Sequence, residues 1–149
     1  MNTSNRIAAE TAIRELAERY CDAVNRRDGD AWGATWSTHA AWTLGETTTV
    51  GRDAIVERWL TLMARVPLVV QELSFGMVDG PTHDGATAGR WYITEFTQRP
   101  QGAARVCGLY RDRYVIEEGS WRFAARDFEI LHAERNLAPD KLPGADRDR

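Results

Sequence analysis

Four long runs rich in β-branched and aromatic residues occupy the second half of the chain. They extend over residues 68–78, 86–98, 104–117 and 121–132, and only short segments with Gly, Pro, Asp or Glu separate them. Such runs are typical of strands, and long strands joined by short turns pair as antiparallel neighbours. Any fold of this chain must therefore accommodate a long, mainly antiparallel sheet.

The first half of the chain has helical periodicity instead. Apolar residues recur at spacings of three and four over residues 4–27 and again over residues 53–66, where Pro67 ends the pattern. Between them, Asp28 or Asp30 can cap a second, short helix. We expect that helix to continue through Trp36, which would place two tryptophans one turn apart.

A small β-hairpin interrupts these helical segments. Residues 41–44 and 47–50 alternate as strands do, and Gly45 and Glu46 form the turn between them. The predicted fold is α+β: a strongly bent antiparallel sheet packs on three N-terminal helical segments and encloses a conical cavity. Because three helices do not cover a sheet of this size, we expect a homodimer or homotrimer with sheet faces in the interface.

Length and composition limit the classes of function. A chain of 149 residues with 43% hydrophobic and 28% charged residues is typical of one folded domain, which we place at residues 1–137, with a disordered tail at 138–149. No apolar run is long enough to cross a membrane, and we expect a cytoplasmic protein. A net charge of −3 offers no attraction for phosphate backbones. We therefore expect neither nucleic acid nor membrane as a partner.

Metal and cofactor motifs are also absent from the sequence. His39, His83 and His132 are dispersed, and Cys21 and Cys107 do not form a CxxC pair. The chain has no glycine-rich phosphate loop, no GxSxG motif and no dinucleotide fingerprint. We expect no metal and no cofactor.

Six tryptophans are more than a core of this size needs for packing. They admit two interpretations: a well-packed core, or an apolar cavity for a ring-shaped ligand. In the second interpretation the ligand-binding tryptophans are Trp36, Trp42, Trp59 and Trp91.

Several segments together resemble a known family. They are residues 12–16 (AIREL), 19–32 (RYCDAVNRRDGDAW), 40–43 (AAWT), 51–55 (GRDAI), 88–92 (AGRWY), 108–114 (GLYRDRY) and 119–123 (GSWRF). The chain resembles SnoaL-like proteins over residues 8–132. This resemblance implies the cone-shaped NTF2-like fold. That superfamily includes polyketide cyclases, scytalone dehydratase, bile-acid dehydratase, hexachlorocyclohexane dehydrochlorinase and ketosteroid isomerase, and also adaptor domains that perform no chemistry.

The resemblance implies roles for residues of the first helix. A tyrosine at the place of Tyr20 points into the cone of the related enzymes and polarises a substrate oxygen. The related dehydratases pair an aspartate, at the place of Asn25, with a histidine on the first long strand; here the aspartate is replaced and residues 68–80 contain no histidine. Glu72 lies on that strand and becomes the candidate base, a carboxylate in an apolar cavity.

The later strands add a second polar set. Tyr110, Asp112 and Tyr114 alternate onto one face, and Asp112 lies near the place of the isomerase's second oxyanion donor. Alternatively, Asp112 forms a structural ion pair with an arginine such as Arg126. Glu95 shares a face with tryptophan and isoleucine residues of its strand and is a further carboxylate candidate.

Two functions follow from these observations. The first is a cofactor-free lyase, isomerase or cyclase that acts on a small apolar ring compound, with Tyr20, Glu72 and Asp112 as catalytic residues. Its ligand-binding set is Asn25, Trp36, Trp42, Trp59, Trp91, Tyr110 and Arg126. The second is a non-catalytic binding or assembly domain. A cavity with a carboxylate near Tyr20 would favour the enzyme, and a cavity filled by side chains would favour the assembly domain.

Overall fold

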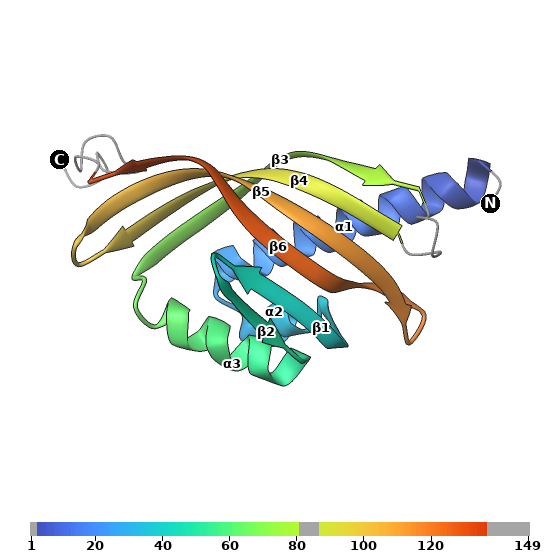
Figure 1. The fold of residues 1–149 in the computed structure, drawn as a ribbon, viewed down its shortest axis with the longest axis horizontal. Helices are drawn as coiled ribbons and strands as arrows, with labels where there is room; N and C mark the ends of the chain where they lie inside the picture. The colour runs from blue at the N-terminus through green and yellow to red at the C-terminus, as the bar shows by residue number, and fades with distance from the viewer. Residues whose placement is uncertain (1–2, 81–86, 137–149) are drawn as a thin grey trace.

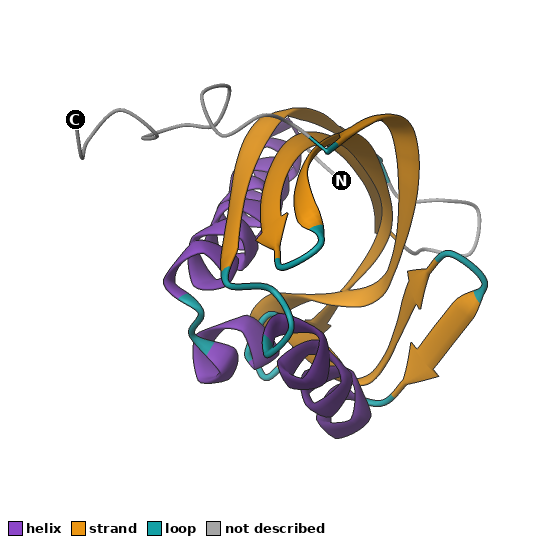
Figure 2. Ribbon diagram, turned by 90° about the vertical axis from the view of Figure 1, so that its left-hand side faces the viewer, coloured by secondary structure: helices purple, strands orange, loops and turns teal. Residues whose placement is uncertain are grey.

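A computed structural model describes residues 3–80 and 87–136, and it has three helices packed on a six-stranded sheet. The elements are α1 (Thr3–Arg26), α2 (Gly29–Gly33), β1 (Trp36–Leu44), β2 (Thr47–Val50), α3 (Arg52–Met63), β3 (Leu68–Asp79), β4 (Thr87–Arg99), β5 (Gly102–Glu117) and β6 (Ser120–Arg135). The strands curve strongly, and α1 and α3 lie along the open side of the curve (Figures 1 and 2). The predicted α+β architecture is confirmed.

The sheet has the strand order β2-β1-β6-β5-β4-β3. The four long strands are antiparallel neighbours, as the sequence predicts. The pairing of β1 with β6 is parallel, however, so the expectation of an antiparallel sheet holds only in the main. A register shift between Leu73 and Phe75 interrupts the alternation of β3. This irregularity decides which side chains of β3 face the concave side.

The helices differ from the prediction in one place. Asp28 caps α2, because its side chain accepts a hydrogen bond from the backbone N–H of Ala31 at 2.9 Å. The helix ends at Gly33, and Trp36 begins β1, so the prediction of a helix through Trp36 is wrong. The two rings nevertheless meet, because Trp32 and Trp36 pack with centroids 5.5 Å apart.

A contact between α1 and α3 fixes the end of the cone. Arg27 follows α1 with a φ of 56°, which turns the chain out of the helix. Its guanidinium group donates to the carbonyl oxygens of Val66 at 2.8 Å and Met63 at 2.6 Å. These bonds hold the last residue of α3 and the turn after it, where the Met63 carbonyl oxygen also accepts from the Val66 backbone N–H at 3.1 Å. They also hold Met63 and Val66 against the concave face of the sheet.

Most of the tryptophans form a continuous aromatic core. Trp32 is fully buried, stacks on Trp59 at 4.7 Å, and contacts Trp42 at 5.3 Å. Trp91 is buried against Gly76, where an added Cβ would lie 2.1 Å from its ring. A side chain at Gly76 would displace Trp91 from this position.

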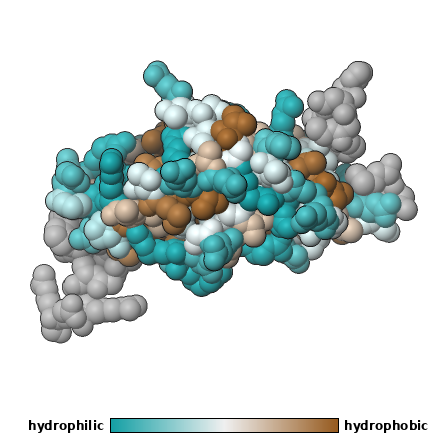
Figure 3. All heavy atoms as spheres, turned by 90° about the horizontal axis from the view of Figure 1, so that it is seen from below, coloured by the Kyte–Doolittle hydropathy of each residue, from teal (hydrophilic) through white to brown (hydrophobic). Residues whose placement is uncertain are grey.

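Hydrophobic side chains also reach the surface. The face formed by α3, β1 and β2 shows them grouped between hydrophilic residues (Figure 3), and the exposed hydrophobic residues of these elements are Val50, Leu60 and Leu62. Among the described residues, no helix is long and apolar enough to cross a membrane. The predicted tail at residues 138–149 lies outside the described residues.

Candidate functional site

A cavity of about 540 Å³ lies between the concave face of the sheet and helices α1 and α3. This volume is in the range of small-molecule sites. Its lining combines residues from the helices and from the long strands: Tyr20, Val24, Trp42, Leu44, Trp59, Leu62, Met63, Val66, Val69, Gln71, Glu95, Thr97, Arg99, Gln101, Gly102, Ala103, Ala104, Val106, Tyr110, Phe128, Ile130, Arg135 and Asn136. The cavity is therefore open to a ligand, which favours a binding function over a core filled by side chains.

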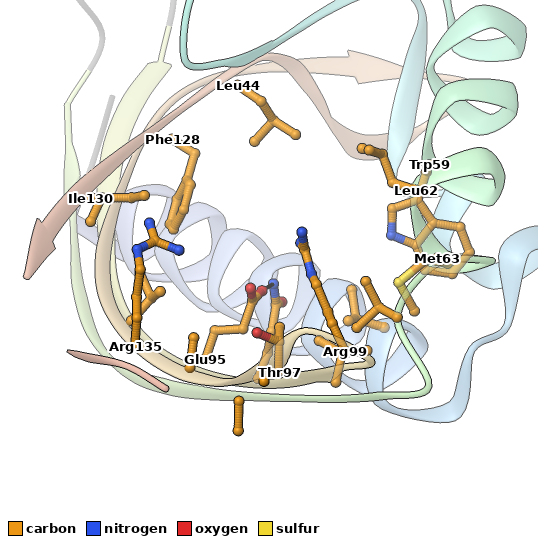
Figure 4. Close-up of a pocket in the computed structure, with 18 of the residues that line it drawn as sticks. Leu44, Trp59, Leu62, Met63, Glu95, Thr97, Arg99, Phe128, Ile130 and Arg135 are labelled. Atoms are coloured by element: carbon orange, nitrogen blue, oxygen red, sulfur yellow. Dashed lines mark hydrogen bonds between the residues drawn. The ribbon is translucent and has the colours of Figure 1, made fainter. Parts of the chain in front are cut away.

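The walls of the cavity are mostly apolar. Trp59 and Met63 contribute from α3, Leu44 from β1, and Phe128 and Ile130 from β6 (Figure 4). Aromatic and aliphatic surfaces of this kind bind an apolar ring by removing it from water.

Polar groups gather at one end, where the lining residues are buried. The side-chain amide of Gln71 donates to the Glu95 carboxylate at 2.7 Å and to the Tyr110 hydroxyl at 3.2 Å. Gln71 and Glu95 are cross-strand partners of β3 and β4. The Gln71 side-chain oxygen has no hydrogen-bond partner among the described residues. The pair thus places one carboxylate at the inner end of the cavity and fixes its orientation.

Burial shifts the titration of these groups. Burial raises the pKa of Glu95 above its ordinary value, and the Gln71 hydrogen bond and the charge of Arg99 oppose that shift. Burial also raises the pKa of Tyr20 to about 12, against the charge of Arg126 and hydrogen bonding with Tyr110. The Tyr20 hydroxyl therefore stays protonated at neutral pH and can donate a hydrogen bond to a ligand.

A buried ion pair between Arg126 and Asp112 packs against the rings of Tyr20 and Tyr110. Arg126 binds the Asp112 carboxylate through Nε at 2.8 Å and Nη2 at 2.9 Å, and both side chains are fully buried. The guanidinium group lies 4.3 Å from the ring centroid of Tyr20 and 3.8 Å from that of Tyr110. Burial disfavours the Arg126 cation, but the charge and hydrogen bonds of Asp112 outweigh it and raise the pKa of Arg126.

Asp112 is therefore part of the fold and does not line the cavity. Its second oxygen accepts a hydrogen bond from the Tyr114 hydroxyl at 2.9 Å, and Trp91 donates to the same hydroxyl at 2.7 Å. The predicted ion pair with Arg126 is confirmed. The prediction of Asp112 as a catalytic oxyanion donor is wrong, because its oxygens are occupied by the pair and by Tyr114.

The position of Glu72 corrects the main catalytic prediction. Its side chain is exposed and does not line the cavity, whereas the neighbouring Gln71 is buried and does. Successive strand residues point to opposite faces, so with Gln71 inward Glu72 points outward. The carboxylate of this region that lines the cavity is Glu95, which is half-buried. A signal for it existed in the sequence, because Glu95 shares the apolar face of Trp91 and Ile93.

Asn25 does not line the cavity either. Its side-chain amide donates to the Gln71 carbonyl oxygen at 2.8 Å, and its side-chain oxygen accepts from the Gln71 backbone N–H at 2.7 Å. Asn25 thus connects α1 to β3 through both of its polar atoms. Its predicted role in direct ligand binding is replaced by a structural one.

The predicted aromatic residues divide between core and cavity. Trp42, Trp59 and Tyr110 line the cavity, as does Tyr20. Trp36 and Trp91 are fully buried in the core and do not line it. Trp36 and Trp91 thus fit the interpretation as packed core, and Trp42 and Trp59 lie where a ligand-binding role would need them.

Three residues line the cavity that were not predicted there from the sequence: Gln71, Arg99 and Arg135. Arg99 lies four residues after Glu95 on β4, so its place on the same face follows from alternation once Glu95 is placed. Arg135 lies beyond the predicted end of the last strand, which the structure extends from residue 132 to 135.

The histidines and cysteines are not grouped. His39 and His132 are exposed, and His83 lies outside the described residues. Within residues 3–80 and 87–136, no three His, Cys, Asp or Glu side chains lie close enough together to hold a metal ion.

Solved structures of low sequence identity have the same architecture. A hexachlorocyclohexane dehydrochlorinase (LinA) type 2 matches with a TM-score of 0.82 and 16% identity, over 95% of this chain and 100% of that chain. A protein provisionally assigned as a scytalone dehydratase, from Novosphingobium aromaticivorans DSM 12444, matches with a TM-score of 0.81 and 14% identity, over 92% and 93%. These similarities show the NTF2-like fold.

A third structure is more similar in sequence. It is a protein provisionally assigned as an aromatic ring hydroxylase, from Novosphingobium aromaticivorans, with 25% identity, a TM-score of 0.78, and coverage of 88% of this chain and 95% of that chain. No curated protein matches the sequence. The family model of the SnoaL-like domain matches residues 5–127, which is most of the chain. The chain therefore belongs to the SnoaL-like domain family.

Proposed function

We propose that this protein is a cofactor-free lyase, isomerase or cyclase that removes a proton from a small apolar ring compound bound in the cavity. The observation that carries the proposal is the Glu95 carboxylate, held by Gln71 at the polar end of an apolar cavity. A carboxyl whose pKa is raised by burial is a stronger base once ionised than a solvated one. The family fold, shared with dehydratases and dehydrochlorinases, supports this class of reaction.

In the proposed reaction, each polar group of the cavity has its own role. Glu95 takes a proton from a ring carbon next to a carbonyl group. The electron pair of that C–H bond forms a C=C bond to the carbonyl carbon, and the π pair of the C=O bond moves onto the oxygen. Tyr20, whose hydroxyl remains protonated, donates a hydrogen bond to that oxygen. Returning the proton to another carbon completes an isomerisation, and expelling a β-substituent completes an elimination.

A proton-exchange assay tests this step without knowledge of the natural substrate. β-Tetralone is an apolar ring ketone, and exchange of its α-protons in D₂O can be followed by NMR. We expect the protein to accelerate exchange, and Glu95→Gln to lower that acceleration by about 100-fold or more. Glu72→Gln is the matched control, because it makes the same change on the outer face of the neighbouring strand. Equal exchange rates for the wild type and Glu95→Gln would contradict the proposal.

The second candidate is a non-catalytic small-molecule-binding domain. The Asn25 contacts favour it, because the residue at the place of the family's catalytic aspartate is an amide whose polar atoms are both engaged by the backbone of Gln71. Binding of β-tetralone with no acceleration of exchange would support this candidate over the enzyme.

A further inference from the structure

Two arginines face the cavity at its exposed end. Arg99 lies at the end of β4 and Arg135 at the end of β6, and both line the cavity. Their guanidinium groups lie within the curve of the sheet (Figure 4). Both residues are exposed, whereas Tyr20 and Tyr110 of the same lining are 2% and 3% exposed. The arginines thus mark the mouth of the cavity and the tyrosines its deep end.

Among the described residues, neither of these arginines forms an ion pair, although the charge of Arg99 acts on the Glu95 carboxyl inside the cavity. Within the described part of the chain, no hydrogen bond or ion pair involves the side chain of Arg99 or Arg135. Three arginines of the sheet that do not line the cavity, Arg90, Arg105 and Arg111, each pair with a carboxylate, at 3.1, 3.6 and 3.0 Å. Arg99 and Arg135 therefore lie at the mouth of the cavity without an ion pair among the described residues, as Arg113 and Arg122 do outside it.

The charge of the cavity is the reverse of the charge of the chain. Among the described lining residues, Glu95 is the single acid, and its carboxylate is already held by Gln71. Two guanidinium groups against one carboxylate leave the cavity positive, although the whole chain has a net charge of −3. A positive cavity in an acidic protein attracts and orients anions.

We propose that the ligand of this cavity is an organic acid, with an apolar ring against Trp42 and Trp59 and a carboxylate held by Arg99 and Arg135 at the mouth. This inference rests on the proposed function for its site and narrows the substrate class. Glu95 and Arg99 are four residues apart on one strand, roughly 13 Å between their Cα atoms. A fused-ring acid can therefore place its carboxylate at the arginines while its ring reaches toward Glu95.

A pair of probes that differ only in charge tests the proposal. β-Naphthoate carries a carboxylate, and β-naphthamide replaces it by a neutral amide of similar shape. We expect the wild-type protein to bind naphthoate about tenfold more tightly in isothermal titration calorimetry, the sum of two partly exposed charge-assisted contacts. The preference should decrease at higher salt concentration.

Substitution of the arginines tests whether Arg99 and Arg135 cause the preference for naphthoate over naphthamide. Arg99→Gln/Arg135→Gln should abolish the preference for naphthoate and leave naphthamide binding within about twofold, since only a charged contact is removed. Arg113→Gln is the matched control, an exposed arginine outside the cavity lining that should leave the preference unchanged. Circular dichroism and thermal unfolding establish that each variant is folded.

Several results would overturn the inference. These are equal binding of the two probes by the wild type, an unchanged preference in the double arginine variant, or no binding of naphthoate at millimolar concentration. The assay measures binding without turnover, so it is independent of the proposed reaction. If the naphthoate preference is observed but Glu95→Gln leaves β-tetralone exchange unchanged, the acid-binding site stands and the catalytic proposal is wrong.

Discussion

Removing the charge of Asp112 should cost more stability than any exposed ion pair of this protein. Asp112→Asn keeps the size of the side chain but replaces one acceptor oxygen by an NH₂ group, which then faces donors. Arg126 can then donate to at most one oxygen of this side chain, and that oxygen carries no negative charge. The guanidinium group keeps its own positive charge, because an arginine side chain does not lose its proton in a protein, and it stays fully buried between aromatic rings. A buried charge left without its partner typically costs about 3–5 kcal/mol.

Urea unfolding followed by tryptophan fluorescence measures this cost. A domain of this kind has a total stability of about 5–15 kcal/mol, so a loss of about 3–5 kcal/mol should lower the unfolding midpoint by at least 1 M, with an unchanged slope. The matched control is Glu129→Gln. The ion pair of Glu129 with Arg111 has a similar distance, 3.0 Å, but both side chains are more than half exposed. Its loss should cost less than about 1 kcal/mol.

A double variant separates the unpaired charge from the lost contacts. Asp112→Leu/Arg126→Met removes both charges together and should recover much of the stability, because a buried pair contributes little once its desolvation is counted. A loss for Asp112→Asn no greater than that for Glu129→Gln would refute this reasoning. Such a result would mean that water or another group stabilises the positive charge of Arg126 in the variant.

Four further predictions concern the site and the assembly. Tyr20→Phe should lower β-tetralone exchange by roughly 100-fold while costing about 0.5–1.5 kcal/mol of stability; an unchanged rate would assign Tyr20 to packing alone. Because burial raises the pKa of Glu95, the rate of exchange should increase with pH as this carboxyl ionises, at a pKa above the ordinary 4.5. The unfolded chain releases this proton at a lower pH than the folded protein, so the free energy of unfolding should fall as pH rises from 4.5 to the folded-state pKa. Glu95→Gln should remove both dependences in a pH–rate profile and in urea titrations. We expect light scattering to give a molecular mass of two or three times 16.8 kDa for the wild type. Phe75 lies on a sheet face and is 55% exposed, so Phe75→Glu should give the mass of the monomer. A monomeric wild type at micromolar concentration would exclude the oligomer. Asn25→Asp should cost roughly 1–3 kcal/mol in urea unfolding, because an oxygen replaces the amide that donates to a carbonyl group, and wild-type stability would contradict the role given to Asn25.

Periodicity predicted the long elements, because their patterns extend over many residues. The structure places β3 and β4 within about two residues of the predicted runs. Trp36 was misplaced because its spacing of four from Trp32 is also a helical spacing. The parallel pairing of β1 with β6 could not be read from the sequence, since it joins segments about eighty residues apart and no turn signal accompanies it.

The carboxylate that lines the cavity was predicted on the wrong strand for a related reason. Alternation states which residues share a face but not which face is concave, so Glu72 and Glu95 were equivalent candidates from pattern alone. The irregularity between Leu73 and Phe75 adds to this ambiguity, because the apolar residues before and after it point to different faces. The aromatic neighbours of Glu95 were the better guide, since Trp91 and Ile93 must be buried.

The contacts of Asn25 explain why Gln71 and Glu95 meet at all. β3 is an edge strand, and the backbone N–H and C=O of Gln71 both bond to Asn25, so they point away from β4. In an antiparallel pair this makes Gln71 and Glu95 a non-hydrogen-bonded pair, in which opposite side chains approach most closely. The Gln71 to Glu95 contact of 2.7 Å follows from that arrangement. The Asn25 amide on α1 thus fixes the position of the edge strand β3. The carboxylate of the cavity belongs to Glu95 on β4 and not to a residue of α1.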